Sequence, residues 1–240
     1  MKAFIISTPP FNVYEHMAFD EALARSCDKN QEIFYLRFFN WGANTAGDAL
    51  TFGYAQFFNQ IEQEMKLNNF NGPFTRRPTG GGVVYHKQDL TFSCVFSSEL
   101  TRPKIIYNKL HGAINRCLST NKASAMFDES AFDKNAYAPE QGGRAGACFA
   151  TPVPDDIMDD KGNKILGGAI RRFDNIVLYQ GSLQAQNCRG GAEFESAIKN
   201  AVEQEWGLEF EPFSFSEHHI NNIKQVANLQ YKSDNWIKKF

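Results

Sequence analysis

Segments with the composition of β-strands are concentrated in the middle of this chain, and segments with helical patterning precede, separate and follow them. A regular alternation of one strand and one helix, as in a parallel βαβ array, is not present. This arrangement predicts an α+β fold, in which helices pack on a mixed or antiparallel β-sheet. The expected strands, rich in β-branched and aromatic residues, are 2–8, 32–38, 49–55, 83–86, 90–97, 164–172 and 175–184.

The expected helices combine helical spacing of apolar residues with local start signals. Asn12 followed by Glu15 has the pattern of a capping box, which predicts that a helix begins there. Pro103 is expected in the first turn of another helix, because its missing N–H costs nothing at that position. The expected helices are 15–26, 57–70, one that begins at Pro103, 194–207 and 217–231.

Size and composition restrict the classes of function. The chain has 240 residues, of which 42% are hydrophobic, as in ordinary globular proteins. The net charge of −2 gives no general attraction to nucleic acids or membrane surfaces, and no apolar run is long enough for a transmembrane helix. The five cysteines are scattered without a CxxC spacing, which predicts reduced thiols, a cytoplasmic location and no metal site.

The stretch RRPTGGGVVYH places Arg76 and Arg77 before three consecutive glycines and a short strand. Gly80, Gly81 and Gly82 allow positive φ angles and a close approach of the backbone to a ligand, while the arginines can face a carboxylate or phosphate. No GK[ST] sequence follows, so the stretch is not a P-loop. A β-hairpin turn with surface arginines explains the same residues.

A second glycine-rich stretch, KILGGAIRR, follows Lys164 with Gly167 and Gly168, and YQGSL then brings Gly181. An ammonium group beside backbone N–H groups suits an acyl or phosphoryl oxygen that becomes negatively charged. Lysines at hairpins are more often simply solvated, and Lys164 alone does not distinguish the two interpretations.

Several motifs together resemble one family. RRPTGGGVVYH with LTFS after it, KILGGAIRR, HMAFDEAL, LTFGYAQ and YQGSL occur in the order seen in the lipoate–protein ligases and octanoyltransferases, over residues 12–185. That family shares its fold with the catalytic domain of biotin ligases. The resemblance implies one catalytic domain over residues 1–240, in which the glycine loop and the Lys164 strand enclose an octanoyl or lipoyl chain. The substrate-binding residues that it implies are Arg76, Arg77, Gly80, Gly81, Gly82, His86, Gly167, Gly168 and Gly181.

The family that the chain resembles contains enzymes of two reaction types, transferases and ligases. The segment ACFATPVPDD resembles the CFxxP segment of cysteine-dependent octanoyltransferases, which implies that Cys148 is a nucleophile; a small buried thiol is the alternative. The third glycine, Gly82, is more typical of the ligases. Two positions depart from the family pattern, because Ile170 replaces a glutamine and Gln180 replaces a histidine.

The interpretation that we favour is a protein acyltransferase of lipoate metabolism. Cys148 would carry the octanoyl or lipoyl group as a thioester, and Lys164 would stabilise the oxyanion; the transferase needs no cofactor. The implied acceptors are lipoyl carrier domains of the glycine cleavage H protein or of 2-oxoacid dehydrogenase E2, with acyl carrier protein as a possible donor. One alternative is an ATP- and Mg²⁺-dependent lipoate–protein ligase that forms lipoyl-AMP. Another is a non-catalytic protein that binds lipoyl domains or acyl groups.

The remaining titratable residues are expected to be structural. We expect His111, His218 and His219 on the surface, and Cys94 and Cys117 in the core. The segments DDIMDD and KILGGAIRR, joined by a KGN turn, are expected to form a hairpin, and its carboxylates Asp156 and Asp159 are interpreted as turn or cap residues. Replacement of Lys164 is expected to impair acyl transfer and to change stability little.

Overall fold

The computed structural model describes residues 1–41, 49–100, 102–120, 156–158, 163–185 and 188–240. Its two sheets form a mixed α+β fold, which confirms the predicted fold class. The large sheet has seven strands in the order β10-β1-β2-β6-β9-β8-β7, and the small sheet has three in the order β4-β3-β5. In the large sheet β1 is parallel to β2 and β10, and the remaining neighbours are antiparallel.

The strands and helices have the following bounds. The strands of the large sheet are β1 (Lys2–Ser7), β2 (Ile33–Phe38), β6 (Leu90–Ser97), β7 (Ile157–Met158), β8 (Lys164–Phe173), β9 (Ile176–Leu183) and β10 (Glu211–Ser214). The small sheet consists of β3 (Ala49–Phe52), β4 (Phe74–Arg76) and β5 (Val84–His86). The helices are α1 (Val13–Ser26), α2 (Phe58–Leu67), α3 (Pro103–Thr120), α6 (Ala192–Trp206), α7 (Glu217–Val226), the π-helical turn η3 (Ala227–Tyr231) and α8 (Asp234–Ile237).

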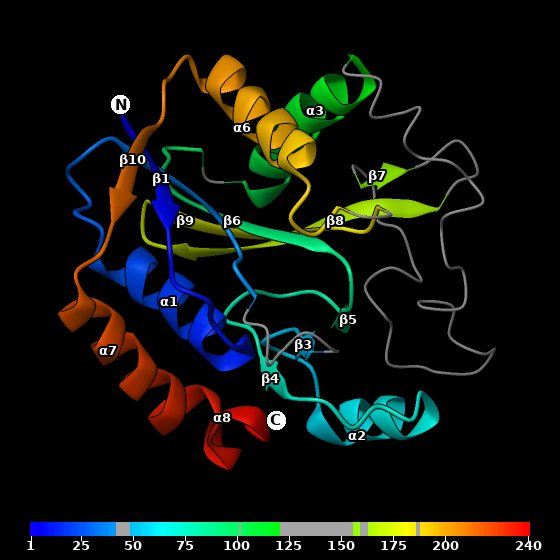
Figure 1. The fold of residues 1–240 in the computed structure, drawn as a ribbon. Coiled ribbons are helices and arrows are strands. Elements are labelled where there is room, and N and C mark those ends of the chain that lie inside the picture. Colours follow the sequence, from blue (N-terminus) through cyan, green and yellow to red (C-terminus); the bar gives the residue numbers. More distant parts are fainter. Residues whose placement is uncertain (42–48, 101, 121–155, 159–162, 186–187) are drawn as a thin grey trace.

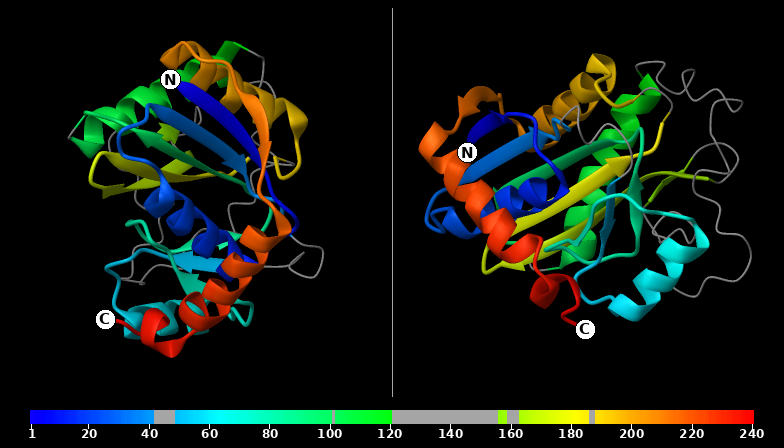
Figure 2. Two further views of the ribbon diagram at one scale, coloured as in Figure 1. Left: turned by 90° about the vertical axis from the view of Figure 1, so that its left-hand side faces the viewer. Right: turned by 60° about the horizontal axis from the view of Figure 1, so that its bottom comes forward.

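The helices form layers on both faces of the large sheet (Figures 1 and 2). Helices α3 and α6 cover one face, where the largest hydrophobic cluster includes Phe34, Phe96 and Tyr179. Helices α1 and α7 cover the other face, and α1 also contacts the small sheet through β3 and β4. Helix α1 therefore lies between the two sheets, and its side chains can contribute to a site between them.

The local signals that predicted the starts of two helices lie at helix N-termini in the structure. The Asn12 side chain accepts hydrogen bonds from the N–H groups of Tyr14 and Glu15, and the Glu15 carboxylate accepts one from the Asn12 N–H, which confirms the capping box. Helix α3 begins at Pro103 as predicted. None of the described helices is both long and apolar enough to cross a membrane.

Three short elements were not predicted. Strand β4 has three residues, α8 has four, and β10 contains a proline, so none carries a clear periodic signal. They are stabilised by their neighbours instead: β10 pairs with β1 along the edge of the large sheet, and β4 pairs with β3.

Candidate active site

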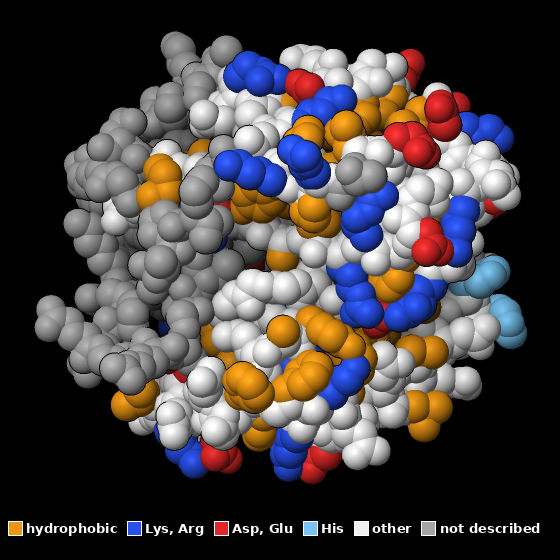
Figure 3. Space-filling view, turned by 180° about the vertical axis from the view of Figure 1, so that it is seen from behind, with side chains coloured by type: hydrophobic (Ala, Val, Ile, Leu, Met, Phe, Trp, Pro, Cys, Tyr) orange, Lys and Arg blue, Asp and Glu red, His pale blue; other side chains and the backbone are white. Residues whose placement is uncertain are grey.

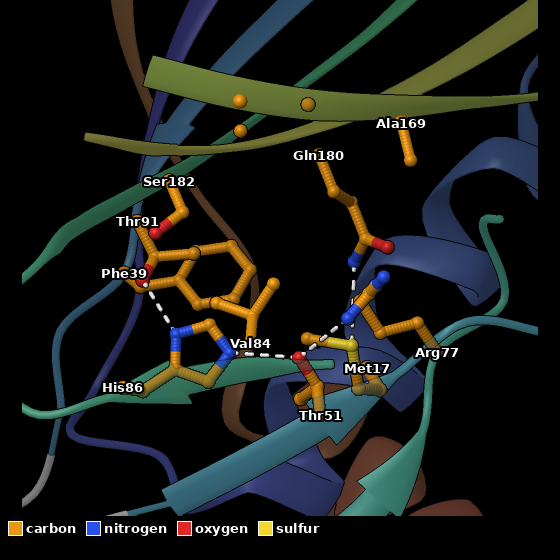
Figure 4. A pocket seen from close by; sticks show the side chains of 13 residues that line it. Met17, Phe39, Thr51, Arg77, Val84, His86, Thr91, Ala169, Gln180 and Ser182 are labelled. Carbon is orange, nitrogen blue, oxygen red and sulfur yellow. Dashed lines mark hydrogen bonds between the residues drawn. The ribbon is translucent and has the colours of Figure 1, made fainter. Parts of the chain in front are cut away.

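A pocket of about 400 Å³, counting the space at its open mouth, lies between the two sheets (Figure 4). One wall is the backbone of two neighbouring strands of the large sheet, and the facing wall belongs to the small sheet and the residues after it. The large sheet contributes Thr91 from β6, Gly167, Gly168 and Ala169 from β8, and Gln180, Gly181 and Ser182 from β9. The other side chains that line the pocket are Met17, Phe39, Thr51, Arg77, Val84 and His86.

The glycines of β8 and β9 lie in the pocket, where the sequence analysis placed them. Gly168 pairs with Gly181 across the two strands, and the buried ring of Tyr179 covers both from the opposite face. A Cβ atom at Gly181 would lie 2.7 Å from that ring, and one at Gly168 would overlap its hydroxyl. The glycines at these two positions are therefore required by the packing of Tyr179 behind the pocket wall.

The structure predicts a clear consequence for Gly168. Alanine at this position is expected to destabilise the fold by about 1–3 kcal/mol, the usual cost of overpacking, because Tyr179 is fixed and cannot move aside. Gly80→Ala is the matched control, since a Cβ there meets no atom within 4 Å. Urea unfolding of both variants tests this expectation, and equal stabilities would contradict it.

If Gly80 lies against the acyl chain, as the resemblance implies, Gly80→Ala will weaken acyl binding without loss of stability.

The loop of three glycines is held by Arg77. Its guanidinium donates to the carbonyls of Gly80 and Gly82, at 2.7 and 2.9 Å, and to the Thr51 hydroxyl at 3.0 Å. Gly81 has a φ of 86°, in the left-handed region that favours glycine. Arg77 lines the pocket and is 5% exposed, so the alternative of a hairpin turn with surface arginines is wrong.

The structure does not bring Arg76 to the pocket. This fully buried guanidinium donates to five backbone carbonyls, those of Gly53, Tyr54, Gln56, Trp236 and Ile237. These contacts tie β4 to the segment after β3 and to the C-terminal helix α8. They support a role in folding, and the substrate-binding role implied for Arg76 stays a prediction.

His86 lines the pocket and belongs to a buried polar network. Its Nδ1 lies 2.9 Å from Asp89. Its Nε2 lies 2.8 Å from the Thr51 hydroxyl (Figure 4). Burial alone would raise the pKa of Asp89, but the neighbouring His86, Ser182 and Arg189 lower it to about 2. The ionised carboxylate only accepts hydrogen bonds, which makes Nδ1 the protonated nitrogen of His86 and leaves Nε2 towards Thr51.

Gln180, at the position where the family has a histidine, is held by a second buried network. Its Nε2 donates to Asp20 at 2.8 Å, and its Oε1 accepts from the Thr79 hydroxyl at 2.7 Å. Asp20 also forms a fully buried ion pair with Arg37 at 2.6 Å. The sequence analysis missed Asp20, Arg37 and Thr79. A usable signal was present, because an arginine within the apolar strand IFYLRF requires a buried anion nearby.

Lys164 is buried rather than solvated. Its ammonium lies 2.9 Å from the Asp156 carboxylate, and the exposed fractions of the two side chains are 3% and 0%. Asp156 is therefore an ion-pair partner, and its interpretation as a turn carboxylate is wrong. The Tyr107 hydroxyl donates to the same carboxylate at 2.5 Å.

One of the three histidines expected on the surface is in the core. His111 is 2% exposed, stacks on Tyr107 and lies 2.7 Å from the Tyr179 hydroxyl, so its assignment to the surface was wrong. It lies on the inner side of α3, which the sequence alone did not distinguish from the outer side. His218 and His219 are exposed as expected, and Figure 3 shows histidine side chains on the molecular surface.

Cys148 and Asp159 lie outside the described residues, so the proposed nucleophile stays a prediction. Cys94 and Cys117 are buried as expected. Burial raises the pKa of Cys27 to about 11 and that of Cys188 to about 12, which keeps both as neutral thiols. The described residues contain no group of three or more His, Cys, Asp or Glu side chains that could hold a metal ion.

Known structures share this fold over the whole chain. Lipoate-protein ligase A bound with ATP superposes with a TM-score of 0.71 at 19% identity, and 99% of each chain is covered. A bi-partite lipoate protein ligase from Thermoplasma acidophilum, described with its E2 lipoyl domain, gives 0.70 at 18% identity and covers 99% of this chain and 96% of its own. These likenesses confirm the fold.

Sequence comparison gives the family. Octanoyltransferase LipM of Bacillus subtilis (strain 168) is 24% identical over an alignment with a length of 276, which covers 97% of this chain and 95% of the relative. Octanoyltransferase LipM of Brevibacillus brevis is 31% identical over 180 residues, which cover 70% and 60%. The family described as the lipoyl protein ligase A/B catalytic domain matches residues 12–240. The chain therefore belongs to the lipoyl protein ligase A/B catalytic domain family.

Proposed function

We propose that this protein is an acyltransferase of lipoate metabolism, which transfers an octanoyl or lipoyl group to a lysine of a lipoyl carrier domain. The observation that carries the proposal is the pocket between the sheets, one wall of which is the nearly bare backbone of Gly167, Gly168 and Ala169 on the same strand as the buried Lys164. A flexible acyl chain can lie along such a wall. The relatives named octanoyltransferase, one of which aligns over 97% of the chain, favour transfer over ligation.

The proposed reaction has two steps. The Cys148 thiolate attacks the carbonyl carbon of an acyl thioester, a new C–S bond forms, the C–S bond to the donor breaks, and the donor leaves as a thiolate that takes up a proton from solvent. The neutral amine of the carrier lysine then attacks the enzyme thioester, the C–S bond breaks and releases the Cys148 thiolate, and the nitrogen loses a proton to solvent as the amide forms. In both steps a carbonyl oxygen becomes negative, and the Lys164 ammonium together with backbone N–H groups would stabilise it.

The acceptor that we propose is a lipoyl carrier domain, either the glycine cleavage H protein or a 2-oxoacid dehydrogenase E2, with acyl carrier protein as donor. The Thermoplasma acidophilum ligase, which shares the fold, is described with an E2 lipoyl domain, and this supports the class of partner. The transferase would need no cofactor. We also propose a cytoplasmic location, where a thiol such as that of Cys148 stays reduced.

A lipoate–protein ligase is the second candidate, since the third glycine of RRPTGGG, Gly82, is typical of ligases. In that case ATP and Mg²⁺ would activate the carboxylate as an acyl-adenylate. The two candidates differ in what they consume, because the ligase needs a free acid with ATP and the transferase needs a thioester alone.

Mass spectrometry after incubation with octanoyl-acyl carrier protein tests the proposal. We expect one octanoyl adduct that hydroxylamine removes, that forms without ATP and that is lost in Cys148→Ser. Cys27→Ser is the control and should keep the adduct, because Cys27 is the more exposed of the described cysteines and has a raised pKa.

An ATP–pyrophosphate exchange assay tests the ligase alternative. Exchange that depends on lipoate or octanoate, with no adduct on Cys148, would establish the ligase instead. Binding of a lipoyl domain with neither adduct nor exchange would favour the non-catalytic alternative.

A further inference from the structure

A chain of hydrogen bonds joins Lys164 to the pocket wall through a residue outside the predicted site. The ammonium of Lys164 lies 2.9 Å from one oxygen of Asp156, and the Tyr107 hydroxyl donates to the other oxygen at 2.5 Å. The same hydroxyl accepts the N–H of Gly168 at 3.1 Å. Since Gly168 lines the pocket, Tyr107 connects the ion pair of Lys164 to the backbone of the pocket wall.

Tyr107 is itself held firmly. Its ring stacks on His111 with 3.8 Å between ring centroids, and His111 lies 2.7 Å from the Tyr179 hydroxyl. Tyr179 is fully buried beneath Gly168 and Gly181. The aromatic groups of α3 and β9 thus fix the Tyr107 hydroxyl behind the pocket wall, with Gly168 at the centre of the arrangement.

We propose that Tyr107 is a positioning residue for acyl transfer, which orients the Asp156 carboxylate and through it the Lys164 ammonium relative to Gly168. The proposal rests on the function proposed above, in which Lys164 stabilises the oxyanion. A lysine has a long flexible stem, so the position of its ammonium depends on how firmly its ion-pair partner is held. Stabilisation of a developing charge requires donors that are already in place, so a partner that fixes the ammonium before the reaction raises the rate.

Tyr107→Phe removes the hydroxyl alone. Tyr35→Phe is the matched control, because Tyr35 is also half-buried and packs on the opposite face of the sheet. We expect Tyr107→Phe to lower kcat of acyl transfer by about 10- to 100-fold, the effect of a small misplacement of a catalytic group, while KM for the acyl donor stays the same. Tyr35→Phe should leave both constants unchanged.

A double-mutant cycle separates positioning from a general structural effect. If Tyr107 acts through Lys164, Tyr107→Phe will not slow a Lys164→Ala enzyme further. A Tyr107→Phe enzyme with the normal kcat would overturn the proposal, and so would the same loss of rate in the presence and absence of Lys164.

A second measurement does not depend on activity. A short pulse of an amine-acetylating reagent, read by peptide mass spectrometry, compares Lys164 with Lys66, whose side chain is 71% exposed. We expect slow labelling of Lys164, several-fold faster labelling in Tyr107→Phe, and no change in Tyr35→Phe. An unchanged ratio of Lys164 to Lys66 labelling in Tyr107→Phe would overturn the proposal. If the protein transfers no acyl group at all, the proposed function fails, and this ratio still decides whether Tyr107 holds Lys164.

Discussion

Lys164→Ala is expected to slow single-turnover acyl transfer by roughly 10²–10³-fold and to destabilise the fold by about 3–5 kcal/mol. The rate falls because one donor to the developing oxyanion is lost. The stability falls because the Asp156 carboxylate, whose side chain is fully buried, loses the cation that compensates it. Rapid-quench kinetics and urea unfolding measure the two effects.

A double variant separates these effects. Lys164→Ala combined with Asp156→Asn removes the uncompensated charge, so it should recover much of the stability and none of the rate. Lys164→Arg keeps the charge, but the planar guanidinium presents its donors differently, and transfer should remain severely impaired. Near-normal transfer by Lys164→Ala would show that the lysine is structural.

Asp89→Ala is expected to cost about 3–5 kcal/mol, because four neighbouring groups lose a buried acceptor. The His86 ring, the hydroxyls of Thr91 and Ser182 and the guanidinium of Arg189 all approach this carboxylate. Urea unfolding at neutral pH measures the change. Asp174→Asn is the control and should change stability little, because Asp174 is exposed, its ion pair with Lys29 lies on the surface, and asparagine tolerates its φ of 57°. Equal stability of the two variants would contradict the expectation.

The same carboxylate predicts an acid-sensitive component of stability. The folded state lowers the pKa of Asp89 from the ordinary 3.8 to about 2, so ionised Asp89 stabilises the protein above pH 4. That contribution, about 2 kcal/mol from the separation of the two values, is lost as the pH falls from about 4 to about 2. Asp89→Ala should therefore show a shallower loss of stability over this range, and an unchanged slope would be evidence against the assignment.

Features that depend on neighbouring residues in the sequence could be predicted. The capping box of α1, the start of α3 and the bounds of β6 follow from local patterns, and the structure confirms them. The glycines of β8 and β9, whose motifs are local, line the pocket, and their substrate-binding role stays a prediction. The fold class followed from the order of these elements.

Features that depend on distant partners could not be predicted. The acceptors of Arg76 include the carbonyls of Trp236 and Ile237, 160 and 161 residues further along the chain. No local signal marks a guanidinium that will meet such partners. Lys164 pairs with Asp156, which in turn accepts a hydrogen bond from Tyr107, 49 residues earlier in the chain. Because of this buried ion pair, the prediction that loss of Lys164 changes stability little is replaced by an expected loss of stability.

The small sheet is attached to the C-terminal helix, so one wall of the pocket cannot be completed until that helix has been synthesised. Thr75 donates to a carbonyl 156 positions later, and two of the five acceptors of Arg76 follow 160 and 161 positions later. At about 5–20 residues per second, a ribosome needs roughly ten to thirty seconds to make that stretch. During this interval the Arg76 guanidinium and the apolar cluster around Phe52 and Ile61 lack part of their final covering. The facing wall of the pocket is thus completed only after the segment that contains Tyr231, Trp236 and Ile237 has been made.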